Sequence, residues 1–151
     1  IIYSDVISIP EDVEKETRAR RVELDELLST SDLITLHVPL DRSTHHMIST
    51  RELEMMKSTA ILINACRGPV VDEAALTTAL QSGQIFGAGL DVLEQEPTPS
   101  DNPLLTMDNV VVTPHLASLS VESGIRSTDF AMANVSRLAR GEELESIVHP
   151  V

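Results

Sequence analysis

The sequence predicts an α/β fold in which helices pack on a doubly wound parallel sheet. Short aliphatic runs typical of buried strands recur along the chain, and segments with helical spacing of leucine and alanine separate them. Such alternation is typical of parallel strands joined by right-handed crossovers. The chain has 151 residues, enough for one domain with a substantial core, and only 2% of them are aromatic, so that core must be aliphatic.

The first elements follow this alternation. Ile1–Val6 is expected to form a strand, and Pro10 followed by two acidic residues suits a helix start, because proline fixes φ in the first turn and carboxylates favour the positive helix end. A helix is expected over Glu23–Leu28 and a strand over Leu33–His37. A capping-box pattern that begins at Ser49 predicts a short helix next.

The later elements repeat the pattern. Ile61–Asn64 is a predicted strand, and the helix after it is expected to be capped by Asp72 and ended by a left-handed Gly83. Gln95–Asp108 contains three prolines and is expected to be a stiff surface loop beside the site. Two further strands and a final helix stopped by glycine are expected at Ala88–Val92, Val110–Val112 and Val121–Arg140.

Composition excludes several kinds of partner. A net charge of -13 and a pI near 4.6 argue against nucleic acid and anionic membranes, which attract basic surfaces. The single cysteine cannot form an internal disulfide, and no apolar run approaches the length of a membrane span, so a soluble cytoplasmic protein is expected. The start of the chain has neither methionine nor a signal-like segment and reads as the interior of a longer protein.

Three aliphatic runs are each followed by a residue type that is common in catalysis. Arg67, Glu96 and His115 come after the runs that begin at Ile61, Gly89 and Val110. If these runs are neighbouring parallel strands, all three groups emerge at the carboxyl edge of one sheet, where open α/β folds bind ligands. The sequence therefore predicts one site with a carboxylate anchor and an acid–base pair.

Each of these residues also has a simpler interpretation. Arg67 has the geometry to grip a carboxylate with two hydrogen bonds, although an arginine on its own more often pairs with a surface acid. His115 on its own would more often be structural, but a carboxylate bound to one ring nitrogen would orient the imidazole and favour its protonated form. Glu94 competes with Glu96 for this role; Glu96 is preferred because Pro97 restricts its backbone.

Two aspartates are candidates for cofactor contacts. Asp5 follows the first strand, as does the acid that binds an adenosine ribose one strand beyond a glycine-rich turn, but that turn is absent from this sequence. Gly87–Gly89 fails the context of the glycine fingerprint and is interpreted as a tight turn. Asp91 could accept a hydrogen bond from a nicotinamide amide, and an unspecialised acid at a strand end is nearly as good an interpretation.

Other features are weaker. Cys66 is interpreted as a small buried residue rather than a reactive thiol. His45 and His46 lack metal-binding spacing and are expected in a solvated loop, so no metal is predicted. Ser118 and Ser120 lie near His115, but no nucleophile elbow supports a hydrolase.

The segments Asn64–Asp72, Gly89–Pro97 and Thr113–Ser118 closely resemble the D-isomer-specific 2-hydroxyacid dehydrogenases. The resemblance implies a Rossmann-like NAD-binding domain in which Arg67 binds the substrate carboxylate and His115 with Glu96 acts as acid–base. It implies NAD as cofactor, small 2-hydroxy or 2-oxo acids as substrates and a homodimer of the parent protein. The positions it places along the NAD cleft, besides His115, are Asp5, His37, Val38, Pro39, Ala65, Cys66, Asp91 and Ala117.

The chain departs from that family in length. Members are about twice as long and carry a glycine-rich first βα unit and a substrate domain, so the fold is expected to be incomplete and the isolated piece inactive. Residues 1–140 are expected to be a partial NAD-binding domain and residues 141–151 a segment that returns towards the substrate domain. The alternative function is a non-catalytic, NAD-sensing interaction protein of the kind seen in related corepressors.

Overall fold

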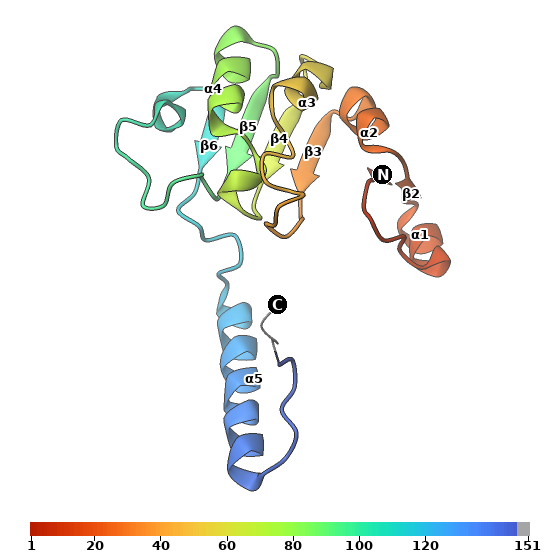
Figure 1. The fold of residues 1–151 in the computed structure, drawn as a ribbon, viewed down its shortest axis with the longest axis vertical. Helices are drawn as coiled ribbons and strands as arrows, with labels where there is room; N and C mark the ends of the chain where they lie inside the picture. The colour runs from red at the N-terminus through yellow and green to blue at the C-terminus, as the bar shows by residue number, and fades with distance from the viewer. Residues whose placement is uncertain (148–151) are drawn as a thin grey trace. The chain divides into compact units, whose positions relative to one another are not determined.

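The computed structural model describes residues 1–147, and its larger sheet has four parallel strands (Figure 1). The strand order is β3–β4–β5–β6, so each strand lies beside its neighbour in sequence. The bounds are Leu33–Leu36, Ile61–Asn64, Gly87–Leu90 and Val110–Val112. The predicted parallel α/β architecture of Rossmann type is confirmed.

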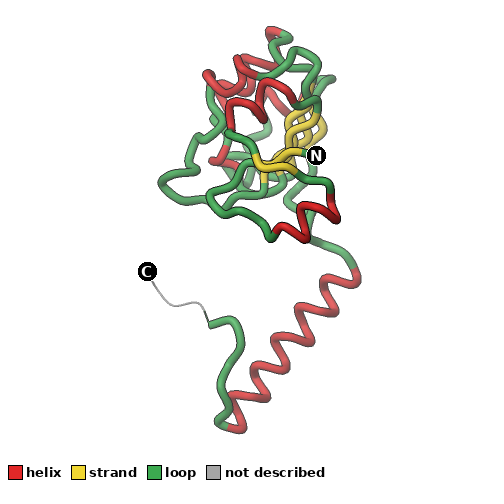
Figure 2. The backbone as a smooth tube through the Cα atoms, turned by 90° about the vertical axis from the view of Figure 1, so that its right-hand side faces the viewer, coloured by secondary structure: helices red, strands yellow, loops and turns green. Residues whose placement is uncertain are grey.

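A second, two-stranded parallel sheet pairs β1 (Ile2–Tyr3) with β2 (Arg20–Arg21), and α1 (Glu11–Thr17) connects them (Figure 2). The predicted strand over Ile1–Val6 is too long. The Asp5 carboxylate accepts a hydrogen bond from the Ile7 backbone N–H at 3.0 Å, which turns the chain soon after Tyr3.

Helices α2 (Leu24–Thr30), α3 (Thr50–Met55) and α4 (Glu73–Ser82) pack side by side, and α3 and α4 cover one face of the large sheet (Figure 1). Side chains alternate across the strands as the pleat requires. Leu36 and Leu62 are buried, whereas Val111 is 68% exposed. The core is aliphatic, as predicted, and lies mainly between this sheet and its helices.

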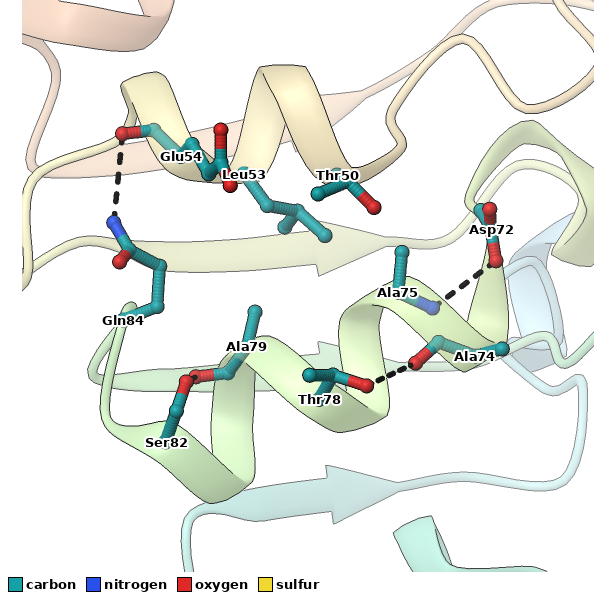
Figure 3. Close-up of a pocket in the computed structure, with 10 residues that line it drawn as sticks. All are labelled: Thr50, Leu53, Glu54, Asp72, Ala74, Ala75, Thr78, Ala79, Ser82 and Gln84. Carbon is teal, nitrogen blue, oxygen red and sulfur yellow. Dashed lines mark hydrogen bonds between the residues drawn. The ribbon is translucent and has the colours of Figure 1, made fainter.

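The predicted helix caps are confirmed. Ser49 and Glu52 form a capping box at α3, and Gly83 ends α4 with φ of 71°. The Asp72 carboxylate accepts the Ala75 backbone N–H at 3.0 Å. Figure 3 shows this cap at one end of a groove of about 380 Å³ between α3 and α4.

Two predictions about the sheet need correction. Gly87–Gly89 is not a tight turn but lies within β5. The Asn109 carbonyl oxygen accepts the Ala88 N–H, and a Cβ on Gly87 would lie only 2.7 Å from this oxygen, so the strand needs glycine there. β5 begins at Gly87 rather than Ala88 and ends at Leu90 rather than Val92. The loop over Gln95–Asp108 is present, with one 3₁₀ turn at Pro103–Thr106.

The chain divides into two compact units, and the second begins at Leu116. It contains α5 (Val121–Arg140), which Gly141 ends with φ of 69°, as predicted. Ser120 caps the start of this helix. The predicted domain boundary after residue 140 stays a prediction, and residues 148–151 of the expected C-terminal segment lie outside the described residues. Every helix within residues 1–147 is too short or too polar to span a bilayer.

Candidate active site

The carboxyl ends of the four long strands lie in one row. The pairing register aligns Leu36 with Asn64, Asn64 with Leu90, and Leu90 with Val112. Residues that follow these four positions therefore emerge at the same edge of the sheet, which is where parallel sheets bind their ligands.

His115 and Glu96 meet at this edge. The distance between His115 Nδ1 and Glu96 Oε2 is 2.9 Å. This hydrogen bond holds the pKa of Glu96 below its ordinary value; partial burial opposes the shift, and the Leu93 backbone N–H, which donates to Glu96 Oε1 at 3.3 Å, adds to it. Glu96 is therefore a carboxylate near neutral pH, and it accepts a hydrogen bond from the Nδ1–H of His115.

The backbone of His115 has an unusual conformation. Its φ is 56°, in the left-handed region, and its N–H donates to the Asp91 carbonyl oxygen at 2.8 Å. Strain of this kind in a residue other than glycine concentrates at functional sites. His115, Glu96 and Asp91 line one hollow of about 800 Å³, together with the loop that contains Pro97.

Asp91 is the buried carboxylate of this hollow, at 7% exposure. The Thr113 hydroxyl donates a hydrogen bond to Asp91 Oδ1 at 2.5 Å. Because β5 and β6 are neighbours, this bond ties together the segments that leave two adjacent strands. It fixes the orientation of the Asp91 carboxyl group at the same edge as His115.

The two candidate glutamates have different partners. Glu94 bonds to Nε2 of His46, and its backbone N–H donates to Glu73 Oε2 at 2.9 Å. Residues 1–147 thus contain two histidine–glutamate pairs, and Glu96 is the glutamate that contacts His115. The predicted solvated loop is right for His45, which is exposed, whereas His46 is half-buried in its pair with Glu94.

Arg67 emerges at the same edge with an exposed side chain, whose Nη1 donates to the Cys66 carbonyl oxygen at 2.5 Å. Among residues 1–147, no hydrogen bond or ion pair joins it to Glu96 or His115. The backbone beside it is nevertheless close to the β5 loop, because a Cβ on Gly68 would lie 1.9 Å from the Leu93 carbonyl oxygen.

The predicted cofactor residues fall into four groups. Asp5, His37 and Val38 line a second hollow of about 890 Å³ between β1 and β3, and Asp91 lines the first hollow. Ala117 belongs to the second unit, and its contact with a cofactor stays a prediction. The remaining three follow strand ends but line neither of these two hollows: Pro39, Ala65 and Cys66.

Cys66 is a half-buried free thiol whose Sγ donates to Asn64 Oδ1 at 3.1 Å. Across residues 1–147, no three side chains of histidine, cysteine, aspartate or glutamate gather in a way that would hold a metal ion. Sequence reasoning did not single out Asn64 or Thr113 for the site. The only signal for either is a polar residue at the end of an aliphatic strand.

Comparison with known proteins identifies the family. Residues 1–117 match the model of the D-isomer specific 2-hydroxyacid dehydrogenase NAD binding domain. A glyoxylate reductase of Korarchaeum cryptofilum is 49% identical over 149 residues, which are 99% of this chain and 45% of that protein. The chain thus spans a little under half the length of this curated relative.

Solved structures agree. D-lactate dehydrogenase with NAD⁺ from Lactobacillus jensenii aligns with a TM-score of 0.91 at 37% identity, over 99% of this chain and 48% of that one. D-lactate dehydrogenase from Aquifex aeolicus, complexed with NAD and lactic acid, aligns with a TM-score of 0.83 at 37% identity, over 93% of this chain and 46% of that one. The chain belongs to the D-isomer-specific 2-hydroxyacid dehydrogenases and contains residues of their NAD-binding domain.

Proposed function

We propose that the protein of which this chain is a part transfers hydride between NAD(H) and a small 2-oxo acid, giving a D-2-hydroxy acid. The observation that carries this proposal is the hydrogen bond between His115 and Glu96 at the edge where all four strands end. A histidine oriented by a carboxylate beside a hollow is suited to give a proton to a carbonyl oxygen or take one from a hydroxyl.

The atoms of His115 have separate roles in this proposal. Nδ1 is occupied by the Glu96 carboxylate, so Nε2 is the ring nitrogen that gives the proton to the substrate oxygen during reduction. The Glu96 carboxylate holds the imidazole in one orientation for that transfer. Arg67 binds the substrate carboxylate through its guanidinium, whose two parallel N–H groups match the two oxygens.

The residues of the second hollow fit the adenosine part of NAD. Asp5 supplies a carboxylate that suits ribose hydroxyls and disfavours the extra phosphate of NADP, and Val38 supplies apolar surface. In the first hollow, Asp91 is held by Thr113 and would accept a hydrogen bond from the nicotinamide amide. The chemistry that the cofactor supplies when bound is hydride transfer.

The relatives' names point to the substrate class. The similar proteins include glyoxylate and hydroxypyruvate reductases and D-lactate dehydrogenases, all of which are named for small 2-oxo or 2-hydroxy acids. A guanidinium anchor and an acid–base pair need only the carboxylate and the neighbouring carbonyl of such a substrate. We therefore propose a short 2-oxo acid as substrate.

The test replaces His115 with glutamine in the complete protein. Because a general acid–base group contributes about 10²- to 10⁴-fold, His115→Gln should lower kcat for reduction by a factor in that range, with NADH affinity unchanged. Steady-state assays of NADH consumption and fluorescence titration of NADH measure the two quantities.

The matched control is His46→Gln, which makes the same change in the other histidine–glutamate pair. It should leave kcat within a few-fold of the wild type. A His115→Gln protein with near wild-type turnover, or a His46→Gln protein with the larger loss, would contradict the assignment.

A further inference from the structure

We propose that Asn64 is a positioning residue that holds the Arg67 turn in the shape required to grip the substrate carboxylate. This inference rests on the proposed function, since it assigns a task to the proposed anchor. Asn64 is the last residue of β4 and is only 1% exposed, which is unusual for a polar side chain.

Both ends of the Asn64 amide are used within the turn that follows it. Its Nδ2 donates to the Arg67 carbonyl oxygen at 2.9 Å. Its Oδ1 accepts the Cys66 backbone N–H at 3.1 Å and also the Cys66 thiol at 3.1 Å. The side chain therefore spans the turn from Cys66 to Arg67 and satisfies backbone groups that the strand ladder no longer pairs.

These bonds require the chemistry of a primary amide. Aspartate would keep the acceptor for Cys66 but lose the donor, and it would place a carboxylate against the Arg67 carbonyl oxygen. Alanine would leave the Cys66 backbone N–H without its acceptor and would remove one of the two donors to the Arg67 carbonyl oxygen, which also accepts the Val70 N–H at 3.2 Å. Asparagine also favours such local side-chain to backbone bonds after a strand.

The turn is also held from the outside. The Asn64 carbonyl oxygen accepts the Asp91 backbone N–H at 2.9 Å, and Gly68 lies against the backbone of Leu93. Asn64 thus fixes the turn from within while the segment after β5 fixes it from the other side. The fixed backbone of the turn sets the position from which the exposed Arg67 side chain extends. The guanidinium itself forms no ion pair within residues 1–147.

The test is kinetic and uses Asn64→Asp in the complete protein. We expect KM for a 2-oxo acid such as glyoxylate or hydroxypyruvate to rise about tenfold, the factor that one lost hydrogen bond produces. kcat should stay within about threefold, because the His115–Glu96 pair is untouched. If Asn64→Asp does not fold, Asn64→Ser, which keeps a shorter donor and acceptor, should show a smaller rise in KM.

The matched control is Asn109→Asp. The Asn109 amide also donates to backbone carbonyls, those of Leu80 and Phe86, but it lies before β6, at the opposite edge of the sheet. This variant should lose stability without a change in KM. An unchanged KM in the Asn64 variants would overturn the proposal.

A double-mutant cycle with Arg67→Ala separates positioning from a general loss of structure. If Asn64 acts through Arg67, Asn64→Asp should change kcat/KM by less than twofold once the guanidinium is absent. If Asn64→Asp lowered kcat/KM by the same factor with and without Arg67→Ala, the inference would be wrong, even if turnover supports the proposed function.

A readout independent of turnover is alkylation of Cys66 by iodoacetamide, followed at the level of its peptide by mass spectrometry. Asn64→Ala, in which the thiol loses its acceptor, should react several-fold faster than the wild type and the Asn109 variant. If the wild type turned over no acid, the proposed function would fail. Equal alkylation rates would then still show that Asn64 does not hold the turn.

Discussion

At the scale of single residues, the proposed acid–base role of His115 depends on which of two nearby glutamates contacts it. Glu94 and Glu96 are separated by one residue, yet one contacts His46 and the other His115. The sequence allowed a preference for Glu96 because proline follows it. It held no information on the partner of Glu94, since His46 lies 48 residues away.

Gly68 tests the close approach between the segments after β4 and β5. Its absent side chain leaves room for the Leu93 carbonyl oxygen, which a Cβ would meet at 1.9 Å. Gly68→Ala should therefore destabilise the protein by about 1–3 kcal/mol or more, since the clash is with backbone. Urea unfolding monitored by circular dichroism measures the change.

The same substitution at Gly124 serves as control. Gly124 lies inside α5 with no atom near its missing side chain, so alanine should stabilise the helix by about 0.5–1 kcal/mol. If both variants shifted the unfolding midpoint in the same direction, the proposed close packing at Gly68 would be wrong.

The candidate site could be predicted from the sequence only where a residue follows an aliphatic run. Arg67, Glu96 and His115 stand out in this way. Asn64 and Thr113 do not, because their roles depend on hydrogen bonds within a turn and across two strands. Neither kind of contact leaves a periodic pattern.

At the scale of elements, helix α4 depends on its first-turn cap. Asp72 accepts the Ala75 N–H (Figure 3). This bond, with a second from the Ser49 hydroxyl, holds the pKa of Asp72 below its ordinary value. Asp72→Ala should cost about 1 kcal/mol of unfolding free energy near pH 7. Chemical denaturation of the two proteins gives this difference.

The pH dependence of that difference follows from the lowered pKa. The stabilisation is fully present above the ordinary aspartate pKa of about 3.9 and is lost as the pH falls through the lower folded value. The gap between wild type and Asp72→Ala should therefore narrow below about pH 4. Thr78→Ala, in the exposed middle of α4, should show no such narrowing. A gap that widened in acid would refute the assignment.

Sequence predicted elements that carry an apolar pattern and missed one that has none. β4, β6 and α5 were predicted with their observed bounds, because their apolar patterns and caps agree. β2 was missed because both of its residues are exposed arginines and it pairs through backbone alone. Such a strand has no hydrophobic pattern to detect.

At the scale of the whole chain, the two compact units differ in burial. The first contains fully buried residues such as Leu28, Leu62 and Ile85, whereas no residue of α5 is buried. In the 151-residue chain, amide hydrogens of α5 should therefore exchange much faster than those of β4 and β5. Hydrogen exchange by mass spectrometry measures this, and equal protection of both would contradict the division.

The central claim is that the complete protein is an oxidoreductase and not a sensor that binds NAD without turnover. The most direct measurement follows NADH absorbance in the complete protein with glyoxylate, hydroxypyruvate and pyruvate, with the configuration of each chiral product. We predict consumption of NADH with at least one acid and a D-hydroxy acid as product. Binding of NADH without consumption with any of them would contradict the account.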